Sequence, residues 1–72
     1  MQLPEFKRKL ARRVRQLRES KEYRQDDLED FGLAWKSVQK IEYGLTDPKA
    51  STLLKLSKAF DMSVAQLLEF ER

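Results

Sequence analysis

Three side chains near the middle of the chain each carry several hydrogen-bonding groups, and a helical wheel places them together. At about 100° per residue, Val38 and Ile41 lie close together and mark the buried side of a predicted helix. Lys36 points almost directly away from that side, and Gln39 and Lys40 flank it. An amide can bridge N6 and N7 of adenine, and an amine can bind guanine O6 and N7 or a phosphate. The pattern predicts a helix whose outer face contacts base pairs in the major groove of DNA, with an ordinary solvated face as the alternative.

A second short helix is predicted immediately before this one. It covers about residues 25–31, and Gly32 separates it from the helix over about residues 35–43. Glycine can adopt the left-handed conformation that ends a helix without a Cβ clash, and Leu33 then fills the space between the two helices. Ala34 has no side-chain oxygen to cap the second helix, so the free backbone N–H groups are left for water or a DNA phosphate.

The composition limits the chemistry available to the chain. It has 72 residues, a net charge of +3, and neither Cys nor His, which excludes disulfides, thiolate zinc sites and imidazole chemistry. No metal or other cofactor is predicted. Without these groups or a Gly-rich loop, the chain is not expected to be an enzyme. A chain of this length forms one domain, here residues 1–72.

The same composition gives an expected location. No apolar run approaches the roughly 20 residues of a membrane span, so no membrane partner is expected. The N-terminal residues do not resemble a signal peptide, because charges interrupt any apolar core. We therefore expect a cytoplasmic protein.

Charge is distributed unevenly along the chain. Residues 7–18 hold seven cations and no anion: Lys7, Arg8, Lys9, Arg12, Arg13, Arg15 and Arg18. Residues 26–30 hold four anions: Asp26, Asp27, Glu29 and Asp30. A basic helix beside a DNA-binding helix attracts a polyanion. The alternatives are an amphipathic helix with Arg on its solvated side, or a surface for an acidic protein; Asp26 and Asp27 also suit the first turn of a helix.

Helical spacing dominates the rest of the chain. The first predicted helix runs from Pro4 to about Lys21, and its apolar residues recur at spacings of four, four and three, namely Phe6, Leu10, Val14 and Leu17. A fourth helix begins at Ala50 or Ser51 and buries Leu53, Leu56 and Phe60. Ser63 can cap a fifth helix, which buries Val64, Leu67 and Leu68. The predicted fold class is all-α with five helices.

Several short motifs occur together in a specific order. They are Val-Arg-Gln-Leu-Arg at 14–18, Gln25 with Leu28, Gly32-Leu33, Val38, Ile41-Glu42 with Gly44, Pro48, and Thr-Leu-Leu-Lys-Leu-Ser-Lys-Ala-Phe-Asp-Met-Ser at 52–63. From about residue 10 to 68, the chain resembles the Cro and phage-repressor type (XRE-like) of helix-turn-helix transcriptional regulators. The resemblance implies a lambda-repressor-like domain in which the helix over 35–43 enters the major groove. It also implies a prokaryotic or phage regulator, associated with the nucleoid.

The resemblance assigns roles to individual residues. The groove-facing positions match Trp35, Lys36, Ser37, Gln39 and Lys40. Phosphate contacts are implied for Gln25, Tyr43, Thr46 and Lys49, and Arg24, where the chain departs from the family, is expected to add a cation near the phosphate backbone. Arg18 and Glu42 match a pair that forms an ion pair between two helices. The family implies a homodimer on a near-palindromic operator, with half-sites about one helical turn (~34 Å) apart.

Four positions depart from the family pattern. The spacing from Leu28 to Gly32 is one residue shorter than usual, so the angle between the two helices of the motif can differ. Glu29 replaces a small Ala, and Arg24 replaces a hydroxyl cap. Trp35 is large where a small or polar residue is common, and it either contacts DNA or packs over the turn.

The apolar C-terminal segment favours protein contacts. Leu67, Leu68 and Phe70 are the expected contact between two copies, although Leu3 and Phe6 could cover that surface within one monomer. The same segment motivates an alternative function, in which the chain is an antitoxin or an adaptor that binds a toxin or another protein.

Overall fold

The longest helix, α1 (Leu3–Ser20), forms around the apolar stripe predicted from the sequence. The computed structural model describes residues 3–70 of the chain. Along α1, Leu10 and Val14 are almost completely buried, and Phe6 and Leu17 are partly buried against the core. Residues at these spacings share one helical face, so the opposite face of α1 is left for charged side chains.

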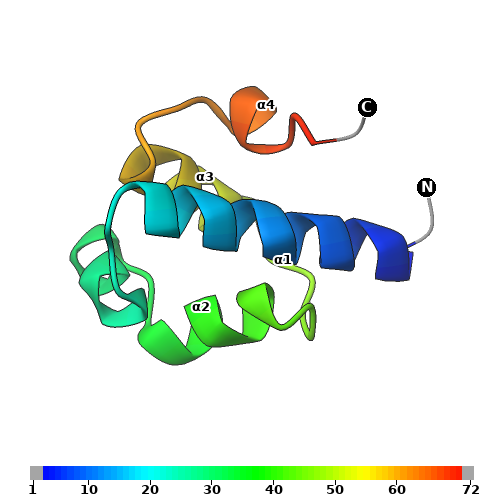
Figure 1. Cartoon of the computed structure of the whole chain (residues 1–72), viewed down its shortest axis with the longest axis horizontal. Coiled ribbons are helices and arrows are strands. Elements are labelled where there is room, and N and C mark those ends of the chain that lie inside the picture. The colour runs from blue at the N-terminus through cyan, green and yellow to red at the C-terminus, as the bar shows by residue number, and fades with distance from the viewer. Residues whose placement is uncertain (1–2, 71–72) are drawn as a thin grey trace.

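Four further helices follow α1 in the described part of the chain, and no strand occurs there. They are η1 (Gln25–Phe31), α2 (Trp35–Glu42), α3 (Ala50–Ala59) and α4 (Val64–Leu67). Figure 1 shows α1 crossing the middle of the molecule, with η1 and α2 on one side and α3 and α4 on the other. The all-α prediction is therefore confirmed. None of the helices in this part of the chain is both long and apolar enough to cross a membrane.

A single apolar core joins all five helices. Its most deeply buried side chains are Leu10, Val14, Leu28, Val38, Leu56, Phe60 and Leu67. Fully burying one such side chain contributes about 1.5–3 kcal/mol, so each short helix is held mainly by the core. This matters most for η1 and α2, which are too short to be stable helices alone.

The segment over residues 25–31 has the predicted bounds but is wound as a 3₁₀ helix. In a 3₁₀ helix, residues three apart lie directly above one another. Gln25, Leu28 and Phe31 have this spacing, so they share one face of η1. On that face Leu28 has zero exposure and Phe31 is partly buried. The rise of about 2.0 Å per residue, against about 1.5 Å in an α-helix, also lengthens the segment, which offsets the residue missing before Gly32.

The short helix α4 begins at the predicted cap. The Gln66 backbone N–H donates to Ser63 Oγ at 3.0 Å, and the Ser63 N–H donates to Gln66 Oε1 at 2.9 Å. This reciprocal pair satisfies two backbone donors that a helix N-terminus leaves free.

Arg13 ties α4 to α1, a role that the sequence did not indicate. Its Nη2 donates to the Gln66 carbonyl at 2.8 Å, and its Nε donates to the Leu67 carbonyl at 3.2 Å. The last carbonyls of a helix have no partner within the helix, and a cation there also complements the helix dipole. One guanidinium therefore holds the C-terminal end of α4 against α1.

The C-terminal side chains expected to contact a second copy pack largely against other residues of their own chain. Leu67 has zero exposure, so the prediction that it contacts a second copy is wrong: its side chain already fills the core of its own chain. The Phe70 ring packs against the Phe6 ring with centroids 5.8 Å apart, as the single-monomer alternative proposed. Leu68 and Phe70 remain half-buried, and the side chain of Leu3 lies outside the described residues.

Candidate nucleic-acid interface

The helix α2 is anchored through one face and exposed along the other. Val38 has zero exposure and Ile41 is 3% exposed, so the buried side of the helix is the predicted one. Lys36, Ser37 and Lys40 are all exposed. The two amines therefore extend from a helix whose position is fixed by the core beneath it.

Gln39 and Trp35 lie at the edges of this exposed face. Gln39 is half-buried, which differs from its predicted place beside Lys36 on the outer face. Trp35 is 41% exposed, and Lys36 Nζ lies 5.8 Å from the centroid of its ring, within the range of a cation–π contact. The indole therefore extends the exposed face and orients the neighbouring amine.

The turn before α2 has the backbone conformation that its glycine predicts. Gly32 has φ of 82° and ψ of 21°, in the left-handed region. Its N–H donates to the Glu29 carbonyl at 3.0 Å, and the Leu33 N–H donates to the Leu28 carbonyl at 3.3 Å. Leu33 is 3% exposed beneath the turn.

A lysine from α3 strengthens this turn. Lys55 Nζ donates to the Gly32 carbonyl at 3.3 Å, which fixes the exit of the turn from outside the motif. Ala34 gives no side-chain cap to α2, so the first N–H groups of that helix have no side-chain acceptor from their N-cap. These donors face the position that a phosphate occupies when a helix N-terminus approaches DNA.

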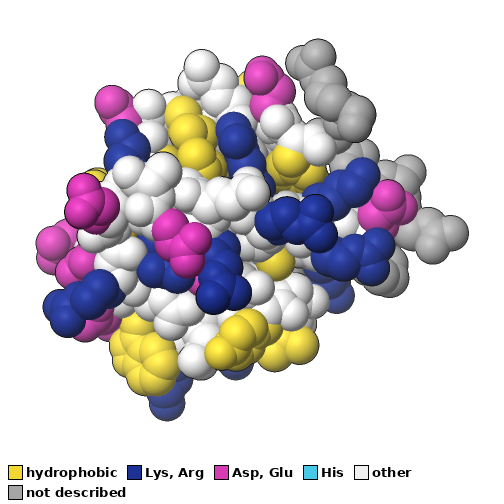
Figure 2. Space-filling model, in the orientation of Figure 1, with side chains coloured by type: hydrophobic (Ala, Val, Ile, Leu, Met, Phe, Trp, Pro, Cys, Tyr) yellow, Lys and Arg dark blue, Asp and Glu magenta, His cyan; other side chains and the backbone are white. Residues whose placement is uncertain are grey.

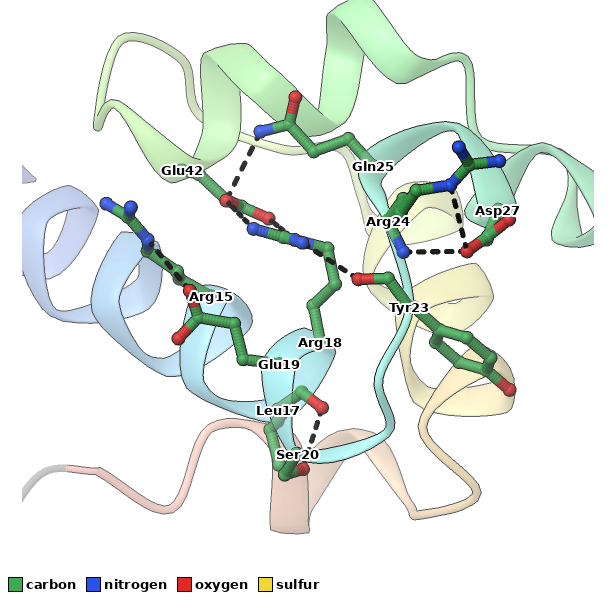
Figure 3. Close-up of polar contacts among 10 residues, drawn as sticks. All are labelled: Arg15, Leu17, Arg18, Glu19, Ser20, Tyr23, Arg24, Gln25, Asp27 and Glu42. Atoms are coloured by element: carbon green, nitrogen blue, oxygen red, sulfur yellow. Dashed lines mark hydrogen bonds and ion pairs between the residues drawn. The ribbon is translucent and has the colours of Figure 1, made fainter.

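Arg18 and Glu42 form the ion pair that connects α1 to α2. Arg18 Nε donates to Glu42 Oε2 at 2.6 Å, and Arg18 Nη2 donates to Glu42 Oε1 at 3.1 Å (Figure 3). Arg18 Nη1 also donates to the Tyr23 carbonyl at 2.8 Å. Only 3% of the Glu42 side chain is exposed. The carboxylate is almost fully withdrawn from water and depends on these donors.

Gln25 joins the same cluster from η1. Its Nε2 donates to Glu42 Oε1 at 3.3 Å, and Figure 3 shows its amide oxygen pointing away from the carboxylate. One amide N–H is therefore used within the protein, and the other remains for a ligand. The cluster fixes the start of η1 relative to α2.

The ion pair also sets the protonation of Arg18. The hydrogen bond that Arg18 donates to Glu42 raises the pKa of Arg18, and this effect outweighs the burial that lowers it. A group with a raised pKa gives stability that is lost only when the pH rises through that pKa. For an arginine this lies far above neutrality, so Arg18 stays protonated throughout the neutral range.

Two grooves flank α2, one near its start and one near its end. The first has a volume of about 420 Å³ and is lined by Arg18, Arg24, Gln25, Asp26 and Trp35. The second has a volume of about 340 Å³, and Ser37, Lys40, Thr46 and Lys49 are among its lining residues. A helix in the major groove has sugar–phosphate backbones beside it, and a groove with cationic residues lies near each end of α2.

Four of the five residues predicted to contact phosphates line one or the other of the two grooves. Arg24 and Gln25 lie in the first groove, and Thr46 and Lys49 lie in the second. Tyr43 lines neither groove, but it follows α2 directly and is 63% exposed.

A comparison with protein families agrees with this geometry. The family model described as helix-turn-helix matches residues 14–67. The chain belongs to the Cro and phage-repressor type of helix-turn-helix family. Neither the search of curated proteins nor that of solved structures found a match. This helix-turn-helix domain, whose motif consists of η1, the turn at Gly32 and α2, is thus a DNA-binding domain of a regulator.

Both ends of the described fold lie outside the region that the family model matches. Residues 3–13 of α1 precede the matched region, and residues 68–70 follow it. Phe6 and Phe70, which pack together, both belong to these flanks. The helix-turn-helix domain therefore carries an additional basic segment on α1 that the matched region does not include.

Proposed function

We propose that the chain is a sequence-specific regulator that inserts α2 into the major groove of an operator. In this proposal Lys36, Ser37 and Lys40 contact base edges or the groove floor, with Trp35 and Gln39 at the margins. Arg24 and Gln25 bind one phosphate backbone, and Tyr43, Thr46 and Lys49 bind the other.

One observation carries this proposal. Lys36 is exposed on α2, Lys40 lines the groove near the end of the helix, and a second groove with cationic side chains lies near its start, while Val38 and Ile41 fix the helix from below. Phosphate contacts position a protein on DNA, and base contacts give it specificity. The arrangement supplies groups for both tasks on one surface.

The proposal includes a homodimer on a near-palindromic operator. A single α2 of eight residues contacts only a few base pairs, and two copies double the sequence that is recognised. The regulator acts in the compartment that contains the DNA, which in a prokaryote is the cytoplasm.

Selection of bound duplexes from a random-sequence pool, followed by sequencing, tests the proposal. We expect an enriched motif with two inverted halves. Binding to that motif should weaken by about 10³–10⁵ between 50 and 200 mM salt, which corresponds to roughly 6–10 phosphate contacts. Failure to enrich any motif, or an affinity independent of salt, contradicts the proposal; enrichment of a single half without its inverted copy removes only the dimer.

A further inference from the structure

A stripe of three arginines runs along the outer face of α1. Arg8, Arg12 and Arg15 are exposed and recur at spacings of four and three, so they lie on one side of the helix over about 10 Å. Arg15 forms an exposed pair with Glu19 at 3.5 Å. Within the described residues, Arg8 and Arg12 form no ion pair. We call these three residues the basic stripe.

The winding of η1 gathers the acidic residues on its outer side. A 3₁₀ helix has three columns of side chains. One column holds the inward residues Gln25, Leu28 and Phe31, and the other two, the acidic columns, consist of Asp26 with Glu29 and of Asp27 with Asp30. Arg24 pairs with Asp26 and Asp27 at 3.5 and 3.9 Å. Glu29 and Asp30 are exposed, with no ion pair in the described part of the chain.

The two charged surfaces appear in one view of the molecule. In Figure 2, Lys and Arg side chains gather over the N-terminal half of α1, and Asp and Glu side chains, with some Lys and Arg beside them, gather toward the opposite end, where η1 lies. Figure 1, in the same orientation, places α2 along the lower edge. By helical spacing, the basic stripe lies on the side of α1 opposite the buried Leu10 and Val14, and it begins before the region that the family model matches.

We propose that this face binds a second copy of the chain, with the basic stripe of each copy on the acidic columns of the other. A half-turn about an axis that lies in this face, perpendicular to the long axis of the molecule, brings opposite charges together at both ends. Such a contact is isologous, because each copy gives the same surface. The half-turn also keeps both α2 helices on one side, where a single duplex can reach them.

The inference rests on the proposed homodimer and names its surface. In the C-terminal alternative, Leu67 is buried and Phe70 packs on Phe6, which leaves the half-buried Leu68 and part of Phe70 for a contact. The charged face offers two reciprocal sets of ion pairs. Each exposed pair contributes little alone, but the sets act together. A contact of this kind weakens with salt.

Two charge-reversal variants, studied without DNA, test the contact. The first carries Glu29→Lys and Asp30→Lys, and the second carries Arg8→Glu and Arg12→Glu. Sedimentation over a series of protein concentrations gives the dimerisation constant at low and at high salt. Circular dichroism melting confirms that each variant is folded.

The expected pattern separates this contact from a general effect of charge. The unmodified chain should dimerise at low salt, and each variant alone should dimerise at least about tenfold more weakly, because like charges face each other. An equimolar mixture of the two variants should recover dimers, since opposite charges again meet at both ends. Reversal of Lys58, which is exposed on α3, should leave dimerisation unchanged.

Three results overturn the inference. A chain that stays monomeric at low salt has no such contact. A mixture that fails to recover dimers excludes pairing between these surfaces. If Arg8→Glu with Arg12→Glu weakens binding to a random-sequence duplex but leaves dimerisation intact, the stripe binds DNA instead. The duplex selection tests DNA binding by α2 separately, and only the inverted repeat expected there depends on a dimer.

Discussion

Glu42 is a single carboxylate that joins three helices of the domain. It accepts from Arg18 of α1 at 2.6 and 3.1 Å and from Gln25 of η1 at 3.3 Å, and it is itself the last residue of α2. A carboxylate that is 3% exposed requires such donors. The residues that fix α2 in place are thus distinct from those that face the solvent.

Arg18→Met should destabilise the fold without removing a group proposed to bind DNA. It leaves the buried Glu42 carboxylate without its main partner, which costs about 3 kcal/mol or more. Chemical denaturation measures the change. Arg15→Met is the matched control on the same helix: its pair with Glu19 is exposed, so the cost should stay below about 1 kcal/mol. Equal losses in the two variants contradict a special role for the Arg18–Glu42 pair.

The raised pKa of Arg18 gives a related prediction. Because this pKa lies far above neutrality, the stability difference between the unmodified chain and Arg18→Met should stay constant from about pH 6 to pH 9. Denaturation curves across that range measure it. A difference that shrinks steadily with rising pH means that the guanidinium does not carry the effect.

Lys36→Ala should weaken binding to the selected operator by about 1–3 kcal/mol if its amine contacts bases. The melting temperature should barely change, because the side chain is exposed. Lys58→Ala removes an equal charge from an exposed position on α3 and serves as the control. A loss that is identical on operator and random duplexes assigns Lys36 to phosphate contact only.

Among the elements, α4 depends most on a contact from outside itself. It has four residues, and Arg13 of α1 donates to two carbonyls at its end. Arg13→Met keeps most of the aliphatic volume but removes both donors. We expect a loss of about 1–3 kcal/mol and faster amide exchange in α4. Arg12→Met, on the exposed face of the same helix, should leave the exchange unchanged; protected α4 amides in Arg13→Met contradict the account.

The turn between η1 and α2 depends on one glycine. Gly32 has a positive φ, and a Cβ there would lie 3.4 Å from the side chain of Lys55. Gly32→Ala should therefore cost about 1–2 kcal/mol through backbone strain, as measured by thermal unfolding. Unchanged stability means that the turn adopts another conformation in solution.

For the helices, the sequence predicted where each one begins and ends better than whether it is an α-helix or a 3₁₀ helix. The bounds of η1 were predicted, but its 3₁₀ form was not, although the spacing of three between Gln25, Leu28 and Phe31 was a usable signal. Val38 and Ile41 identified the buried side of α2, because apolar residues three apart in an α-helix lie on the same face. Gln39 is half-buried, although the wheel placed it beside Lys36 on the outer face.

Among contacts between residues far apart in the sequence, some were predicted and others were not. Arg18 and Glu42 were paired through the family resemblance, since nothing local links residues 24 positions apart. Arg13 and Lys55 were missed because each donates to backbone carbonyls, which leave no mark in the sequence. A buried Leu67 was predicted, but its place inside its own core, rather than in a contact between copies, required the fold.

Across the whole molecule, charge is separated between three surfaces. The exposed side of α2 carries amines, the outer side of α1 carries the basic stripe, and η1 carries the acidic columns. In Figure 2, Lys and Arg side chains gather toward one end of the visible face, and most Asp and Glu side chains lie toward the other. In the proposed arrangement, one surface binds DNA and another binds a second copy, so substitutions should alter the two activities independently.

The central claim is that the exposed face of α2 contacts DNA. Titration of the isotope-labelled chain with its selected duplex, followed through backbone amide NMR shifts, tests this most directly. We expect the largest shifts over residues 24–25 and 35–49, with residues 64–67 of α4 nearly unchanged. Large shifts confined to α1, with α2 unaffected, would contradict the account.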